Sequence, residues 1–263
     1  MTLFRRIDCC LAALLMCIQT VHAEPPRAPE RTPPRYKMDT PTDPGGSGKF
    51  YMGREISLVM GHQGVVWLER PQRIEEEQPS KLLKVLDVKA GMVVADIGAG
   101  SGYHSFRMAK AVGGKGKVLA VDIQEEMLDI IRKRMKRNKV DNIDPIRGTE
   151  TDPKLPAGGV DLILMVDVYH EFAFPYEMTQ ALTKALKPGG RMVFVEFRRE
   201  DEKVPILLAH KMTEKQVLAE MAPHPLKHAK TIESLPWQHV IIFEKKSDKK
   251  DDKSAKGGPK LAR

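Results

Sequence analysis

Short apolar runs rich in valine and isoleucine alternate with longer amphipathic stretches through the middle of this chain of 263 residues. A strand buried on both faces reads as a continuous apolar run, whereas a helix that covers a sheet is apolar on one side only. The pattern therefore predicts an α/β fold, with a parallel sheet covered by helices on both faces. The expected strands are residues 92–97, 117–121, 143–147, 161–166 and 191–197.

Helices are expected between these strands and after the last of them. Pro175 suits the first position of one helix, and Thr213 with Gln216 forms a capping box for the last one. Two strand-like runs follow, residues 226–232 and 239–244, and no crossover helix fits between them. They therefore predict an antiparallel hairpin at the edge of the sheet.

The two ends of the chain differ from this core. Residues 1–23 carry Arg5 and Arg6 and then an apolar run shorter than a bilayer crossing needs. This pattern predicts a secretory signal peptide, and hence export to the periplasm or out of the cell. A misassigned start codon is the alternative, and it would leave the protein in the cytoplasm. Residues 24–48 contain seven prolines and predict an extended linker, and residues 245–263 predict a disordered basic tail.

Most of the formal charge of +8 belongs to that tail, which contributes +5. Without the tail and the signal peptide the charge is only +2, so no nucleic-acid-binding face is expected on the folded part. The tail could contact an anionic surface, although a solvated appendage is the simpler interpretation. All three cysteines lie within the first 17 residues, which excludes a cysteine zinc site or a catalytic thiol further along this chain.

A glycine turn between the first expected strand and the following helix carries the strongest functional signal. An acidic residue, Asp96, lies near the end of that strand, and glycines follow at alternate positions: Gly98, Gly100 and Gly102. Glycines let a ligand approach backbone N–H groups, and the helix N-terminus adds partial positive charge. A dinucleotide site needs a glycine three residues after the second, where this chain has Tyr103, so NAD binding is disfavoured.

Asp122 ends the second expected strand, 22 residues after Gly100, and is placed to accept hydrogen bonds from both hydroxyls of a ribose. With these motifs the chain resembles the class I S-adenosylmethionine-dependent methyltransferases over about residues 82–244. The resemblance implies a Rossmann-like fold, with a doubly wound, mostly parallel sheet of seven strands whose last strand is antiparallel. It also implies S-adenosylmethionine as the cofactor. Residues 49–81 are then expected to form an N-terminal helical cap.

The resemblance implies roles for individual residues as well. The glycine loop would lie beside the methionine part of the cofactor, and Asp96 would help to fix its amino end. Asp122 would hold the ribose, with Ile123 also in the cofactor site. In many such families an acid after the third strand meets the adenine amine. This chain has a threonine at the usual position, so that role passes to Glu150 or Asp152.

Residues 50–56, 67–71 and 166–172 further resemble a bacterial subgroup related to the methyltransferases of ubiquinone and menaquinone biosynthesis. The predicted function is methyl transfer to a small molecule, with an aromatic or quinone-like acceptor. The loop after the fourth strand faces the cofactor in this architecture. There His170 is the expected general base, since an imidazole titrates near neutral pH, and Asp167 is the second candidate. Capping of the next helix is the alternative role of His170.

Two other functions remain open. Residues 100–103 and 116–118 resemble the isoaspartyl-repair protein methyltransferases, whose upstream substrate-loop pattern is not found in this chain. The third interpretation is a non-catalytic domain that binds a nucleoside-like ligand, because a cytosolic cofactor conflicts with an export signal. No metal is expected, since the isolated histidines lack neighbouring ligands at the usual spacing: His62, His104, His210 and His224.

Overall fold

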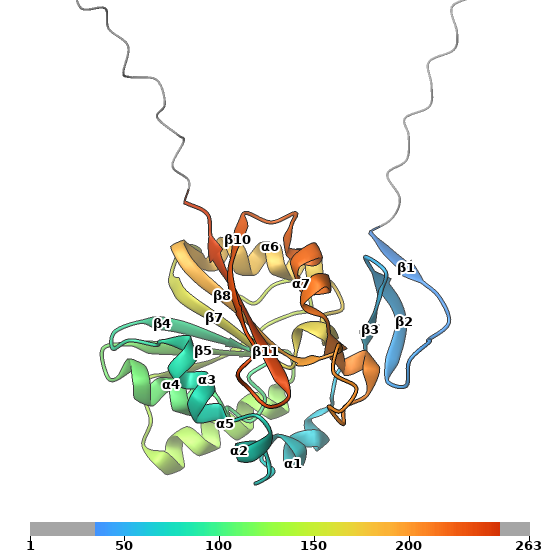
Figure 1. The fold of residues 1–263 in the computed structure, drawn as a ribbon. Helices are drawn as coiled ribbons and strands as arrows, with labels where there is room; N and C mark the ends of the chain where they lie inside the picture. Colours follow the sequence, from blue (N-terminus) through green and yellow to red (C-terminus); the bar gives the residue numbers. More distant parts are fainter. Residues whose placement is uncertain (1–34, 248–263) are drawn as a thin grey trace, which may run out of the picture. The chain divides into compact units, whose positions relative to one another are not determined.

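The main sheet has its strands in the order β10-β11-β8-β7-β4-β5-β6, and a two-residue strand, β9, pairs with β8. Most of these strands are labelled in Figure 1. The structure is a computed structural model and describes residues 35–247 of the chain. The strands are β4 (Val93–Ile97), β5 (Lys117–Asp122), β6 (Ile143–Arg147), β7 (Val160–Val166), β8 (Leu186–Arg198), β9 (Lys211–Met212), β10 (Leu226–Ile232) and β11 (Gln238–Lys245).

Strand β4 pairs in parallel with both β5 and β7. The chain adds β5 and β6 on one side of β4 and then returns to add β7 and β8 on the other. Strand β11 is antiparallel to both β8 and β10. The predicted α/β fold with its terminal hairpin is confirmed, and β9 is an addition that the sequence did not predict. In open sheets of this kind, ligands bind outside the carboxyl ends of the strands where the order reverses.

Helices cover both faces of this sheet because its strand residues are apolar on both sides. The helices α3 (Pro79–Leu86), α4 (Ser105–Val112) and α5 (Glu125–Asn138) bury their apolar sides against one face. The helices α6 (Pro175–Ala185) and α7 (Glu214–Met221) cover the other face. Pro175 begins α6 as predicted, and the Thr213 hydroxyl accepts a hydrogen bond from the Gln216 backbone at 3.0 Å, as a helix cap does.

The N-terminal region departs from its prediction. Residues 35–48 were assigned to the linker and residues 49–81 to a helical cap, but an antiparallel sheet of β1 (Tyr36–Met38), β2 (Gly46–Tyr51) and β3 (Arg54–Ser57) spans their boundary. The physical reason is a buried carboxylate. Glu55 accepts hydrogen bonds from backbone N–H groups of three residues, Thr42, Asp43 and Gly48, which fixes a segment whose composition alone suggests a linker. Helical turns follow β3: η1 (His62–Gly64), α1 (Val65–Leu68) and α2 (Arg73–Glu76).

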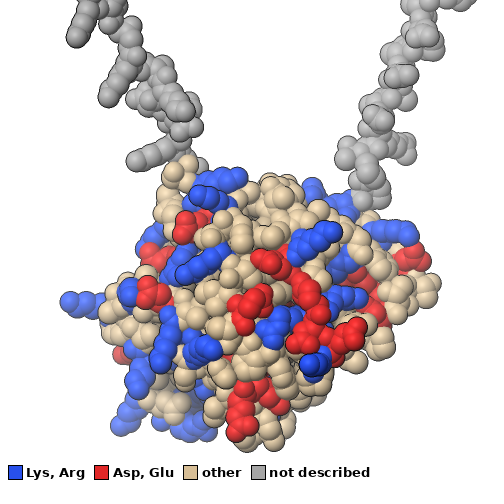
Figure 2. Space-filling model, in the orientation of Figure 1, with Lys and Arg blue, Asp and Glu red and all other residues tan. Residues whose placement is uncertain are grey.

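The predicted signal peptide, the first part of the linker and most of the basic tail lie outside the described residues. Strand β11 extends to Lys245, the first residue assigned to the tail. Between residues 35 and 247, no helix has the length and apolar character needed to cross a membrane. Figure 2 shows that basic and acidic side chains are interspersed over one face of the described part.

Candidate active site

A cavity of about 510 Å³ lies at the carboxyl ends of β4, β5 and β7, which is where the order of the strands reverses. Its volume falls within the ~300–1,000 Å³ of typical cofactor and ligand sites. The predicted site residues that line it are Gly98, Gly100, Asp122, Ile123, Glu150, Asp167 and His170. The topology therefore brings together, at one end of the sheet, most of the residues that the sequence indicated.

The glycine loop borders the cavity with left-handed backbone at Gly98 (φ +66°) and Gly100 (φ +53°). A Cβ atom on Gly98 would lie 2.3 Å from the Val168 side chain, and one on Gly100 would lie 2.8 Å from Leu68. Both positions therefore need glycine for their backbone conformation and for the close approach of a neighbouring segment.

Asp122 lies directly beside this loop. One of its carboxylate oxygens accepts a hydrogen bond from the Gly100 backbone at 2.8 Å, and the other accepts one from the Gln124 backbone at 2.9 Å. Burial raises the pKa of Asp122 despite these bonds. Each carboxylate oxygen has a second lone pair, so the Asp122 side chain can still accept hydrogen bonds from a ligand in the cavity.

Asp96 and Gly102 are not among the residues that line the cavity. The Ser105 hydroxyl donates to the buried Asp96 carboxylate at 2.6 Å, at the start of α4. A Cβ atom on Gly102 would meet Phe106 and Ile131 at about 3 Å, which places this glycine against the helices. Asp96 and Gly102 therefore pack against residues of α4 and α5, and their contact with the cofactor stays a prediction.

The buried carboxyl of Asp96 gives a testable pH dependence. Burial raises its pKa to about 6, against about 3.9 in an unfolded chain. Between these values the folded state binds more protons, so the contribution of Asp96 to stability falls as the pH rises from 4 to 6. We expect Asp96→Asn to remove this effect. As the pH rises from 4 to 7, the free energy of unfolding of the variant should therefore increase by about 2 kcal/mol relative to that of wild type. Urea unfolding across this range measures the difference.

The control for that measurement is Asp144→Asn, because the Asp144 side chain is 47% exposed. Its difference from wild type should stay nearly constant over the same pH range. A constant difference for Asp96→Asn as well would show that Asp96 titrates normally.

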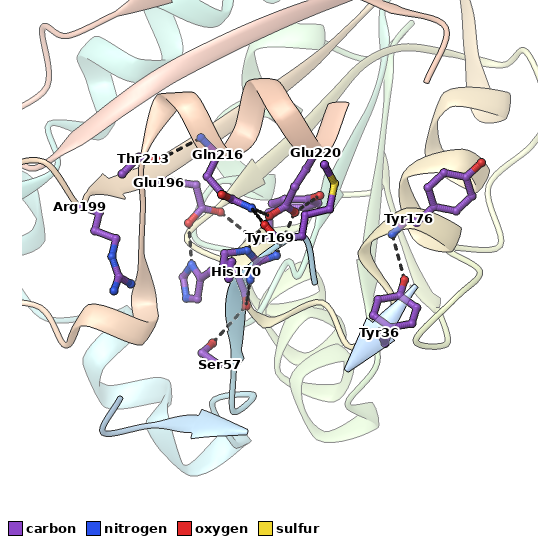
Figure 3. A network of polar contacts seen from close by, with 12 residues as sticks. Tyr36, Ser57, Tyr169, His170, Tyr176, Glu196, Arg199, Thr213, Gln216 and Glu220 are labelled. Carbon is purple, nitrogen blue, oxygen red and sulfur yellow. Dashed lines mark hydrogen bonds and ion pairs between the residues drawn. The ribbon is translucent and has the colours of Figure 1, made fainter. Parts of the chain in front are cut away.

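His170 lies in the 3-10 turn η2 (Tyr169–Glu171) after β7, and Glu196 on β8 fixes its ring. The distance from His170 Nδ1 to Glu196 Oε2 is 2.6 Å (Figure 3). An ionised carboxylate can only accept a hydrogen bond, so Nδ1 donates and Nε2 is left facing His210, whose Nδ1 is 3.1 Å away. Burial lowers the pKa of His170, but the charge of Glu196 and its hydrogen bond outweigh burial and raise it overall.

His210 and Glu171 complete a cluster at this side of the cavity. Burial and the neighbouring His170 lower the pKa of His210 to about 4, whereas burial raises the pKa of Glu171 to about 7. The expectation that His210 is an isolated histidine was wrong. It lies 40 residues beyond His170 in the sequence, so no local spacing could indicate that the two rings meet.

Asp167 also lines the cavity and has left-handed backbone (φ +49°). One carboxylate oxygen accepts a hydrogen bond from Gln238 at 2.7 Å, and the other is buried with no partner within residues 35–247. Burial and then the nearby charges of Glu77 and Glu196 raise the pKa of Asp167 well above its ordinary value. Asp167 therefore offers a free oxygen for an N–H or ammonium group of a ligand.

The segment before α3 supplies further cavity residues, four of which have no role predicted from the sequence. Leu68, Arg70, Arg73 and Glu77 line the cavity, and so does Trp67, which the Arg70 guanidinium covers at 3.6 Å. Arg73 donates to Glu77 at 2.6 Å and to the Leu68 carbonyl at 2.9 Å. The signal available from sequence was the close alternation of arginine and glutamate in residues 69–77, which otherwise reads as a solvated helix face.

A buried polar network fastens the N-terminal sheet beneath this site (Figure 3). Arg54 on β3 forms an ion pair with Glu220 on α7 at 2.8 Å, and the Tyr169 hydroxyl donates to the same carboxylate at 2.7 Å. Arg54 also donates to the His170 carbonyl at 3.1 Å. The turn that carries His170 is therefore held from its main-chain side by a charge network that solvent does not reach.

Comparison with known proteins places this geometry among methyltransferases. The family described as "Methyltransferase domain" matches residues 88–254. A protein-L-isoaspartate O-methyltransferase of Methanothrix thermoacetophila is 32% identical over 109 residues, which are 41% of this chain and 49% of that protein. A demethylmenaquinone methyltransferase of Lactococcus lactis is 26% identical over 117 residues, which are 44% of this chain and 46% of that protein. The chain spans about half the length of the curated relatives it matches.

A solved structure is similar over a larger share of the chain. The crystal structure of an S-adenosylmethionine-dependent methyltransferase from Aquifex aeolicus has a TM-score of 0.67 and 25% identity. The match covers 71% of this chain and all of that one. The chain therefore shares its fold with a protein that depends on S-adenosylmethionine.

Proposed function

The chain belongs to the methyltransferase domain family, and on that premise we propose that it transfers the methyl group of S-adenosylmethionine to a small, apolar, aromatic or quinone-like acceptor. The family match and the solved relative confirm the class I methyltransferase resemblance inferred from the sequence. S-adenosylmethionine is the cofactor of this class, and the cavity offers the glycine loop and Asp122 to hold it. Asp122 would accept from the ribose hydroxyls, and Asp167 from the amino end of the cofactor.

The observation that carries the acceptor proposal is the apolar mouth of the cavity. Several of its lining residues are large, apolar and more than a third exposed: Leu58 (57%), Leu207 (54%), Trp67 (45%), Val59 (44%) and Ile123 (37%). Exposed apolar side chains around a concave site mark the surface where an apolar ligand enters.

The charges in the cavity argue in the same direction. Five carboxylates line it, whereas the described lining contains no lysine, and its two arginines, Arg70 and Arg73, are ion-paired with Glu76 and Glu77. Burial already raises the pKa of Asp122, Asp167 and Glu171, so a further negative charge from an acidic acceptor would be unfavourable there. This disfavours the isoaspartyl-repair alternative, in which the acceptor is a peptide carboxylate. That alternative draws its support from the Methanothrix relative.

Methyl transfer requires the acceptor atom to lie in line with the S–CH₃ bond, and such positioning can supply ~7–11 kcal/mol of the barrier. His170 is the group that can take a proton from an oxygen or carbon acceptor, because Glu196 accepts from Nδ1 and the neutral ring then carries its lone pair on Nε2. Asp167 is next in sequence to Val168, whose side chain packs against Gly98 of the glycine loop. This position suits Asp167 better to hold the cofactor than to act as a base.

The proposal is tested in two steps with the full chain. S-adenosylhomocysteine at 100 times its Kd should stabilise the protein by ~2.7 kcal/mol and raise the melting temperature by about 5–10 °C. Release of S-adenosylhomocysteine is then measured with a hydroquinone, a naphthoquinol and an isoaspartyl peptide as acceptors. We expect turnover with an aromatic acceptor. The absence of any thermal shift, or turnover with the peptide alone, would contradict the proposal.

A further inference from the structure

Three metal-ligating side chains converge at the acceptor side of the cavity. His170 and Glu171 come from η2, and His210 comes from η3 (Leu208–His210), which precedes β9. The His170 Nε2 atom lies 3.1 Å from His210 Nδ1 and 3.9 Å from Glu171 Oε1. The third side of this triangle, from His210 Nδ1 to Glu171 Oε1, is 3.8 Å.

The size of this triangle fits a metal ion. With sides of 3.1, 3.8 and 3.9 Å, the point equidistant from the three atoms lies about 2.1 Å from each of them. Zinc–nitrogen bonds are about 2.0–2.1 Å long and zinc–carboxylate bonds about 2.0–2.2 Å. The three donor atoms therefore need little movement to reach bonding distance of one ion.

Neighbouring residues orient the side chains of His170 and Glu171 toward one another. Glu196 accepts from Nδ1 of His170, so Nε2 is the ring nitrogen that His170 can offer to an ion in the triangle, and outer carboxylates orient metal-bound histidines in the same way. The Glu171 side chain is only 12% exposed, accepts a hydrogen bond from the Met60 backbone, and has ion-pair contacts only with the two imidazoles among the described residues. A largely desolvated carboxylate without a permanent cation is electrostatically incomplete.

We propose that His170, Glu171 and His210 bind one divalent transition-metal ion of the zinc class, with a free coordination position toward the cavity. Two imidazoles and one carboxylate favour such an ion over magnesium, which prefers oxygen ligands alone. Three protein ligands with an open fourth position are typical of catalytic zinc sites. All three residues line the cavity, so that position is accessible to a ligand within it.

The chemical role that we assign to this ion depends on the proposed methyl transfer. A hydroxyl of the acceptor that coordinates the ion becomes more acidic and loses its proton to water. The oxygen then forms a bond to the methyl carbon as the S–CH₃ bond breaks, and the electron pair of that bond stays on sulfur. His170 is a metal ligand in this form of the protein and no longer acts as a base.

The test measures zinc binding directly by isothermal titration calorimetry at pH 7.5, with the full chain stripped by a chelator. Cys9, Cys10 and Cys17 are replaced by serine in every sample, so that thiolates do not compete for the ion. We expect one saturable zinc site per chain and no binding of magnesium under the same conditions. His210→Ala and Glu171→Gln should each weaken zinc binding by about 100-fold, and Glu196→Gln by about 10–100-fold.

His228→Ala is the matched control, because His228 is exposed and lies 3.9 Å from a carboxylate, Glu214, away from the cavity. It should leave the zinc affinity unchanged. If the two histidines only form a hydrogen bond with each other, the protein should have no saturable zinc site, or a zinc affinity that His210→Ala and Glu171→Gln do not change. Either result overturns the inference.

S-adenosylhomocysteine binding is measured on the same stripped samples. A protein that binds S-adenosylhomocysteine but does not bind zinc would overturn the metal site and leave the proposed methyl transfer intact. A protein that binds zinc but does not bind S-adenosylhomocysteine would support the metal site and count against the proposed function.

Discussion

Replacement of Glu220 by alanine is expected to lower the free energy of unfolding by about 3–5 kcal/mol, because it leaves the Arg54 charge buried without a partner. Glu220 is fully buried, and its carboxylate accepts hydrogen bonds from Arg54, Tyr169 and Gln216. Arg54 is only 9% exposed, so water cannot replace the lost partner without a structural change. Urea denaturation followed by circular dichroism measures the loss.

Two variants separate the buried charge from the loss of side-chain volume. Glu220→Gln keeps the shape and one acceptor oxygen of Glu220, and it should cost less than the alanine variant. Arg132→Ala breaks two ion pairs of an arginine side chain that is 44% exposed, and it should change stability by less than about 1 kcal/mol. A loss for Glu220→Ala no larger than that for Arg132→Ala would refute the role assigned to the network.

Replacement of Asp122 by alanine is expected to reduce the affinity for S-adenosylhomocysteine by about 10²–10⁴-fold. The ribose has two hydroxyls, and each hydrogen bond to a charged acceptor contributes about 1.5–3 kcal/mol, whereas about 1.4 kcal/mol corresponds to a tenfold change. The variant also removes the acceptor of the Gly100 backbone N–H, which helps to fix the loop. Isothermal titration calorimetry on folded protein reports the affinity independently of any change in melting temperature.

Asp144→Ala serves as the control for this measurement. Asp144 lies on β6, the strand next to β5, but it is not among the residues that line the cavity. Its replacement should leave the affinity unchanged. An Asp122→Ala protein that binds S-adenosylhomocysteine as tightly as the control would show that the ribose assignment is wrong.

The elements of the sheet could be predicted because their signals are local. Strand β6 has the predicted bounds, and α7 begins after the predicted Thr213 cap. Gly98, Gly100 and Asp122 were indicated because a strand end, a glycine turn and a following helix occupy one continuous segment. Parallel topology then brings the ends of β4, β5 and β7 to one edge of the sheet, and with them most of the predicted site.

The N-terminal region could not be predicted in this way. Its prolines and glycines indicate a linker, and the strands β1 and β2 form because Glu55 supplies buried hydrogen-bond acceptors to the loop before β2 and to Gly48. Glu55 is 13 residues from Thr42, and nothing in its immediate neighbourhood distinguishes it from a surface glutamate. The compensating partner of a buried charge is a property of the fold and not of the local sequence.

The sequence by itself indicated the α/β class and the glycine loop with its acid, since periodicity, turn chemistry and short spacing act over a few residues. The methyltransferase family entered as a resemblance of these motifs, and the family match confirms it. Only the tertiary structure decided which distant groups meet. Arg54 and Glu220 are 166 residues apart, and His170 and His210 are 40 apart, yet each pair is in contact. Such contacts arise when separate elements pack on the sheet, and the charges that they bury are stable only in that packed arrangement.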